Sequence, residues 1–223
     1  DYAKSIARHA AGRVRAVATS AARDATNSSL FFDAAEQALA LRPELLSGEE
    51  EALLSFRGAT FGVDRAQAPF LVVDIGGGST EFVLGSTEPE ALISVPMGCV
   101  RMTERHLASD PPTRDQLECC MADVRDILGA VQRTVPVQRA RRMLGLAGTV
   151  TTLASLALGL PHYDPQRTHH SLLTRVEVES LFARLSGADL EARRSMLTVP
   201  QRAEVIVGGT AVLLTILREF GIH

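Results

Sequence analysis

The stretch DIGGGSTEFVLG, residues 74–85, places a carboxylate, three consecutive glycines, two hydroxyls and a second carboxylate close together. Because glycine has no Cβ, its backbone N–H groups can crowd around an anion and a phosphate oxygen can come close. Asp74 and Glu81 have the spacing to hold a hard cation beside phosphate oxygens, directly or through water. We therefore predict a phosphate and cation site here. Its predicted phosphate-facing glycines are Gly76, Gly77 and Gly78.

The pattern downstream of these glycines excludes two familiar nucleotide loops. A Rossmann or P-loop site places its glycines between a strand and a helix, with G-x-G-x-x-G or a following Gly-Lys pair. Here the next segment, TEFVLG, reads as a strand. The alternative is a tight hairpin whose glycines serve only the turn, although three glycines exceed what a hairpin needs.

A second glycine turn, GLAGTVTT at residues 145–152, has the other arrangement, from a strand into a helix. Backbone N–H groups and the helix dipole at such an N-terminus favour an anion. The alternative is an ordinary helix start capped by Thr149. Two such loops in one chain could grip successive phosphates of one substrate.

The run Ser47-Gly48-Glu49-Glu50-Glu51 predicts a helix start and a candidate base. Ser47 and Glu50 stand in the S-x-x-E relation of a capping box, so a helix is expected from about Gly48. Glu51 lies about 100° further round and can point elsewhere. Near phosphates and a metal, its carboxylate could orient or deprotonate a water for in-line attack. The bland alternative is a solvated first turn whose acids favour the helix dipole.

Two further features allow both a functional and a structural interpretation. Arg23 follows the predicted ATS strand end, where its guanidinium could hold phosphate in a bidentate manner or form a surface salt bridge. Gly208 and Gly209 lie inside a predicted apolar helix, and each glycine destabilises that helix by about 1 kcal/mol relative to alanine. Something must therefore lie close to that backbone, either a packed neighbour or a base or ribose.

The expected elements form an α/β chain with two differently patterned parts. Residues 13–20 predict a strand, followed by a helix, a second helix over 30–41 and a short strand at ELLS. The polar, proline-containing segment VDRAQAP, residues 63–69, is the best linker, so we place domains at 1–68 and 69–223. The second begins with an antiparallel meander of FLVVDI, TEFVLG and ALISVP. Helices are then expected along the stripe 117–131, at VTTLASLAL and over 201–220, with a strand at RMLGLAG.

Composition excludes several classes of protein. The 223 residues are 46% hydrophobic and 22% charged, enough for a real core. A net charge of −3 and only 4% aromatic residues disfavour a nucleic-acid partner. No apolar run reaches membrane-spanning length, and the three cysteines lack zinc or disulfide spacing, which suggests a reducing cytoplasm. The chain lacks an initiator Met, so we expect it to be part of a longer protein.

Taken together, six ordered segments resemble the Ppx/GppA family, the exopolyphosphatases and guanosine pentaphosphate phosphohydrolases of the actin-like ATPase superfamily. The resemblance spans nearly the whole chain. The matching segments are AVATSAARDATN, LLSGEEEALLSFRGATFG, VVDIGGGSTEFVLG, MGCVRMTERHL, LGLAGTVTTLASLALGL and VPQRAEVIVGGTAVL.

The resemblance implies a ribonuclease-H-like α/β fold in two lobes with a phosphate-chain site between them. Members hydrolyse the terminal phosphoanhydride of inorganic polyphosphate, or release the 5′-terminal phosphate of guanosine pentaphosphate, with a divalent cation, usually Mg²⁺. By position, Glu51 matches the catalytic glutamate and Arg23 the phosphate-side arginine. The phosphate and metal loop is matched by Asp74, Gly76, Gly77, Gly78, Ser79 and Glu81, the further phosphate turn by Gly148 and Thr149, and the adenosine motif by Gly208 and Gly209.

The resemblance also has a gap. Family members begin with a strand and a phosphate loop of the form Asp-x-Gly-(Ser/Thr)-Asn-Ser, which has no counterpart here, so we expect an incomplete first lobe. Such a chain could be inactive even where its parent is an enzyme. Exposed apolar surface would favour association, consistent with the homodimers common in the family. The alternatives are a non-catalytic sensor of polyphosphate or alarmone, and an actin-like small-molecule kinase.

Overall fold

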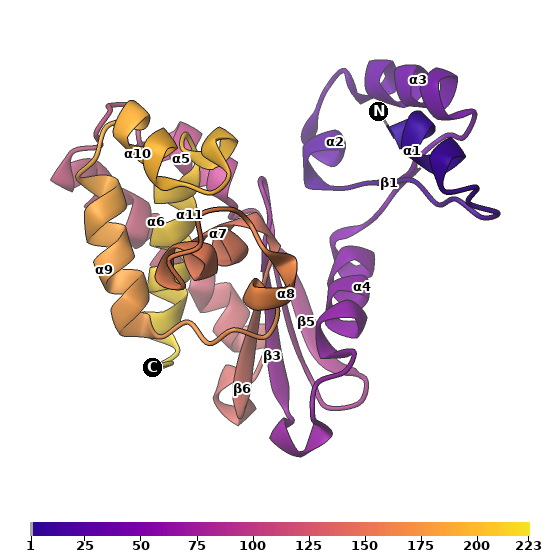
Figure 1. The fold of residues 1–223 in the computed structure, drawn as a ribbon. Coiled ribbons are helices and arrows are strands. Elements are labelled where there is room, and N and C mark those ends of the chain that lie inside the picture. The colour runs from indigo at the N-terminus through magenta and orange to yellow at the C-terminus, as the bar shows by residue number, and fades with distance from the viewer. Residues whose placement is uncertain (1) are drawn as a thin grey trace. The chain divides into compact units, whose positions relative to one another are not determined.

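The computed structural model describes residues 2–223, which divide into two compact units. The first unit ends at Glu51 and the second is Ala52–His223 (Figure 1). The chain is α/β, as expected.

The first unit is small and contains the strand, turn and helix predicted near its start. β1 and β2 pair in parallel, with Val17 opposite Glu44 and Ala18 opposite Leu45. Phe32 of the following helix is buried. The second helix begins two residues before the predicted start and ends two residues before the predicted end. The elements are α1 (Tyr2–Arg8), β1 (Val17–Ala18), α2 (Ser20–Asp24), α3 (Ser28–Leu39) and β2 (Glu44–Leu45).

Helix α4, Gly48–Thr60, begins in the first unit and ends in the second. The predicted capping box is present. The Ser47 amide donates to Glu50 Oε2 at 2.8 Å, and the Glu50 amide donates to Ser47 Oγ at 3.1 Å. Further along the helix, Ala52 and Phe56 are buried. The two reciprocal bonds therefore fix the start of α4. Its apolar residues determine which face of the helix is buried.

The second unit is built on a four-stranded sheet of order β5-β4-β3-β6. β3, β4 and β5 are antiparallel neighbours, which confirms the predicted meander. β6 pairs in parallel with β3, and such a pair needs a long crossover connection. Two helices, α5 (Cys99–His106) and α6 (Arg114–Thr134), supply it. The strands are β3 (Phe70–Ile75), β4 (Thr80–Gly85), β5 (Pro89–Val95) and β6 (Arg142–Leu146).

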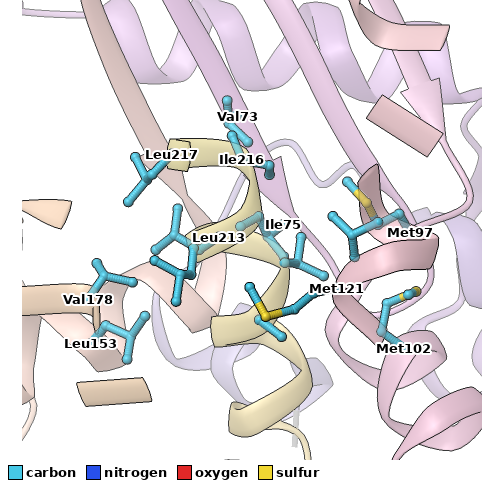
Figure 2. Close-up of a cluster of buried hydrophobic side chains, with 14 of the residues drawn as sticks. Val73, Ile75, Met97, Met102, Met121, Leu153, Val178, Leu213, Ile216 and Leu217 are labelled. Atoms are coloured by element: carbon cyan, nitrogen blue, oxygen red, sulfur yellow. The ribbon is translucent and has the colours of Figure 1, made fainter. Parts of the chain in front are cut away.

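Successive side chains of a strand point to opposite faces of the sheet. Each face of this sheet is therefore covered by different helices. Phe70, Val72 and Val83 face Ala52 and Phe56 of α4. The opposite face carries Val73 and Ile75, which pack with helices of the second unit in the larger core (Figure 2). Figure 1 shows α4 on one side of the strands and α6, α7, α9 and α11 on the other. The predicted stripe of α6 lies in this core, with Met121, Val124, Leu128 and Val131 buried.

Helix α11, Ile206–Glu219, runs through the larger core and is buried from Ile206 to Leu217. It begins later than the predicted residue 201, because Pro200–Arg202 form a separate short 3-10 turn. None of the helices in residues 2–223 has the length and apolar character needed to cross a bilayer. The other helices are α7 (Ala147–Ala157), α8 (Pro165–Thr168), α9 (Arg175–Ser186) and α10 (Leu190–Met196).

The division into units differs in position from the linker expected at residues 63–69. The compact units meet inside α4, between Glu51 and Ala52, because Ala52 and Phe56 pack on the sheet of the second unit. The lobe boundary between residues 68 and 69 stays a prediction, and residues 65–67 form a short 3-10 turn that leads into β3.

Candidate functional site

The glycine turn between β3 and β4 is fixed through its carbonyl groups. The Cys99 amide donates to Gly76 O at 2.9 Å, and the amides of Val100 and Arg101 donate to Gly77 O at 3.0 and 3.1 Å. The Arg101 Nε donates to Gly78 O at 2.7 Å. The first turn of α5 therefore uses its own unpaired amides to bind the turn.

These bonds determine where the amides of the turn point. In a trans peptide the N–H points away from the C=O of the same unit, and no peptide of this turn is cis. The amides of Gly77, Gly78 and Ser79 therefore point away from α5. None of the hydrogen bonds among residues 2–223 uses these three N–H groups. The prediction that the Gly76 amide faces an anion is wrong, because this N–H closes the turn by donating to Ser79 O at 3.0 Å. Gly77 is exposed, Gly78 is half-buried and Ser79 is buried. The turn thus presents consecutive backbone donors, as an anion requires.

Two carboxylates stand beside these amides on the face of the sheet that α4 covers. Asp74 of β3 is the direct partner of Glu81 of β4, so their Cβ atoms lie roughly 5 Å apart. Glu81 is buried, with 1% of its surface exposed, and accepts a hydrogen bond from Ser94 Oγ at 2.7 Å. Asp74 Oδ2 accepts one from Ser55 Oγ of α4 at 2.5 Å. The predicted pair of carboxylates is therefore brought together.

The second glycine turn joins β6 to α7 as predicted. Ala147 has φ of +66°, which bends the chain sharply between strand and helix. Gly148 follows, and a Cβ on it would lie 1.7 Å from Cζ of Arg202. The guanidinium of Arg202 thus lies directly against the first turn of α7. Within residues 2–223, Arg202 forms no ion pair with a carboxylate.

Gly208 and Gly209 of α11 let two neighbouring helices come close. A Cβ on Gly208 would lie 2.3 Å from Thr103 Oγ1 of α5, and one on Gly209 would lie 2.4 Å from Thr149 Oγ1 of α7. Close packing therefore accounts for both glycines. A role for them beside a nucleotide stays a prediction.

The start of α5 links all three glycine features. A Cβ on Gly98 would lie 2.4 Å from Gly77 O, and the Cys99 Cβ lies 3.0 Å from the Cβ position of Gly209. Burial raises the pKa of the Cys99 thiol, and a hydrogen bond with Thr149 and the charge of Arg202 only partly offset this. The thiol is therefore neutral at pH 7 and is a packing residue.

The predicted base and arginine are paired in the first unit. Arg23 Nη1 lies 3.2 Å from Glu51 Oε2 and also donates to the carbonyl of Leu46 at 2.7 Å. The side chains of Arg23 and Glu51 are 23% and 18% exposed. Glu51 is thus not a solvated first-turn acid: a guanidinium held by a backbone carbonyl fixes its position.

Several residues at the site were missed from the sequence. Ser94 carries a detectable signal, because strand alternation places it on the same face as Leu92. Ser55 carries a weaker one, since it lies one helical turn after Glu51 in α4. Arg202 carries none that separates it from an ordinary surface arginine before α11. Ser55 also lines a cavity of about 910 Å³ together with Leu146 and Ala147 at the end of β6.

Comparisons with known proteins cover the whole chain. The model of the Ppx/GppA phosphatase family matches residues 1–223. Exopolyphosphatase 2 of Mycobacterium tuberculosis is 45% identical over 225 residues, an alignment that covers 98% of this chain and 70% of that protein.

Solved structures agree with this match. A crystal structure of an exopolyphosphatase-like protein superimposes with a TM-score of 0.94 at 41% identity, covering 98% of this chain and 71% of that one. The Ppx/GppA family member of Aquifex aeolicus gives a TM-score of 0.82 at 31% identity, covering 99% of this chain and 71% of that one. Both of those chains are longer than the 223 residues of this one.

Proposed function

Since the chain belongs to the Ppx/GppA phosphatase family, we propose that it acts on phosphate chains, releasing the terminal phosphate of inorganic polyphosphate by attack of water. Exopolyphosphatase homologues support hydrolysis as the reaction class. Guanosine pentaphosphate is the second proposed substrate, because amides that contact only phosphate oxygens do not distinguish the two chains.

The observation that carries this proposal is the amide row of Gly77, Gly78 and Ser79. Its N–H groups have no acceptor among residues 2–223 and stand beside Asp74 and Glu81. Three donors in succession suit the oxygens of a phosphoryl group. The paired carboxylates would disfavour such an anion unless a cation offset their charge. The two features therefore support each other as parts of one phosphate and cation site.

The donor set fits Mg²⁺ or a similar hard cation. Mg²⁺ prefers oxygen ligands, keeps several waters and is usually held by one or two carboxylates together with substrate phosphates. No cluster of three or more His, Cys, Asp or Glu side chains suited to a metal occurs in residues 2–223. Asp74 and Glu81 would thus hold the ion without enclosing it. When bound, it would neutralise charge on the phosphate oxygens.

In the proposed mechanism, Glu51 orients a water and accepts its proton as the water attacks the terminal phosphorus in line. Arg23, which holds Glu51 at 3.2 Å, is proposed to contact a phosphate oxygen with its guanidinium. Because one Nη of Arg23 is already engaged by Leu46 O and Glu51, the contact would use the remaining nitrogens.

Gly148, Thr149 and Arg202 are proposed to hold a further phosphate of the same chain. The start of α7 offers a helix dipole that favours an anion. Arg202 adds a positive charge at that point without a carboxylate partner in residues 2–223. The helix dipole and the charge of Arg202 would therefore both favour an anion at this turn.

The test is phosphate release measured in parallel on inorganic polyphosphate and on guanosine pentaphosphate, with the whole protein and Mg²⁺. We expect release from polyphosphate that stops when EDTA removes the cation and returns when Mg²⁺ is restored. Binding of polyphosphate without phosphate release at saturating Mg²⁺ would contradict the proposal and select a non-catalytic sensor. Release that is unaffected by EDTA would contradict the cation site.

A further inference from the structure

Asp74 is held by a residue outside the sheet. Ser55 of α4 donates from Oγ to Asp74 Oδ2 at 2.5 Å, a short bond of the kind formed when the acceptor is charged. Both side chains are partly buried. Asp74 Oδ1 accepts no hydrogen bond from residues 2–223. The two oxygens of this carboxylate therefore have different tasks.

The neighbouring carboxylate is held in the same way. Ser94 is the strand partner of Glu81 and donates from Oγ to Glu81 Oε1 at 2.7 Å. Asp74, Glu81 and Ser94 thus form one row across β3, β4 and β5, and Ser55 approaches this row from α4. A serine hydroxyl contacts each carboxylate of the pair.

Without such a bond, the terminal torsion of an aspartate is broad and either oxygen can face a cation. A fixed donor on Oδ2 selects one orientation and leaves Oδ1 as the oxygen available to an ion. A pre-oriented ligand loses less freedom when the ion binds. Removal of such a supporting partner typically weakens metal binding by about 10–100-fold.

We propose that Ser55 is a positioning residue of the cation site: its hydroxyl holds Asp74 Oδ2 and thereby aims Asp74 Oδ1 at the ion. The inference rests on the proposed function, because it needs a cation at Asp74 and Glu81. It adds a helix residue four positions after Glu51 to the site. The same α4 then carries the proposed base and the residue that orients a cation ligand.

Direct titration of the whole protein with Mn²⁺ alone, followed by the electron paramagnetic resonance signal of the unbound ion, tests this role. We expect Ser55→Ala to raise the Mn²⁺ dissociation constant about 10–100-fold. Ser55→Thr keeps the hydroxyl and should bind Mn²⁺ as the unaltered protein does. If Ser55→Ala fails to fold, Ser55→Cys, which keeps the size but donates weakly, should show the same direction of change.

Ser86→Ala is the matched control. Ser86 also donates to a carboxylate, Glu90 Oε1 at 3.2 Å, but this exposed bond starts in the turn between β4 and β5. The Ser86→Ala variant should leave the Mn²⁺ affinity unchanged. Thermal melting should show that Ser86→Ala and Ser55→Ala are similarly folded.

The Asp74→Asn variant distinguishes a failure of the proposed cation site from a failure of the positioning role of Ser55. If Asp74→Asn and the unaltered protein bind Mn²⁺ equally, or neither binds it, the cation site itself is wrong. If Asp74→Asn loses affinity while Ser55→Ala keeps it, only the positioning role of Ser55 is wrong.

Discussion

Glu51→Gln is expected to lower the rate of phosphate release from polyphosphate by about 10²–10⁴-fold, the usual contribution of a general base. Glutamine keeps the size and the hydrogen-bonding reach of the side chain but cannot accept the proton of the attacking water. Polyphosphate binding should stay nearly unchanged, because the loop amides and the cation ligands are intact. Steady-state phosphate release and equilibrium binding measured on the same samples check both expectations.

The control for this variant is Glu49→Gln, which removes the same charge from the same first turn of α4 at an exposed position. It should keep full activity, which separates the loss of a base from a general change in helix charge. Comparable turnover by Glu51→Gln and the unaltered protein would rule out Glu51 as the base.

Gly98→Ala should produce the second large effect, through the backbone. The added Cβ would lie 2.4 Å from Gly77 O, 2.5 Å from Gly77 C and 2.7 Å from Gly78 N. None of these atoms is the end of a flexible side chain, so the β3–β4 turn itself must move. We expect a loss of about 1–3 kcal/mol in the free energy of unfolding. Phosphate release should fall as well, because the amides of Gly77 and Gly78 are displaced.

Chemical denaturation and phosphate release measure the two effects of Gly98→Ala. Gly129→Ala serves as the control, since Gly129 lies inside α6 and its added Cβ would meet only the end of Arg133 at 3.5 Å. That change should be neutral or slightly stabilising, as alanine favours a helix. A Gly98→Ala protein with unaltered stability and activity would show that the turn is not held as the structure places it.

Much of the fold follows from local patterns in the sequence. The meander β3-β4-β5 could be predicted because each strand is apolar and short turns join them. The start of α4 could be predicted because Ser47 and Glu50 have the S-x-x-E spacing of a capping box. The stripe of α6 follows from helical periodicity, and four of its five predicted positions are buried. Each of these signals lies within one element or between adjacent ones.

The parts that could not be predicted depend on contacts between distant segments. The parallel pairing of β6 with β3 joins segments about seventy residues apart, and no local pattern encodes that register. Likewise, the sequence predicts Gly76–Gly78 as anion-facing, but the Gly76 amide donates to Ser79 O, and only the contact with α5 shows which way the amides of Gly77 and Gly78 point. Ser55 and Arg202 could not be predicted for the same reason, because each contacts a residue in a different element of the fold.

The most direct test of the central claim is an amide-resolved NMR titration with inorganic pyrophosphate in the presence of Mg²⁺. If the turn binds phosphate, the largest shifts should occur at the amides of Gly77, Gly78 and Ser79, and Asp74→Asn should reduce them. Unchanged signals at these three amides, with shifts concentrated elsewhere in the chain, would contradict a phosphate site at the β3–β4 turn.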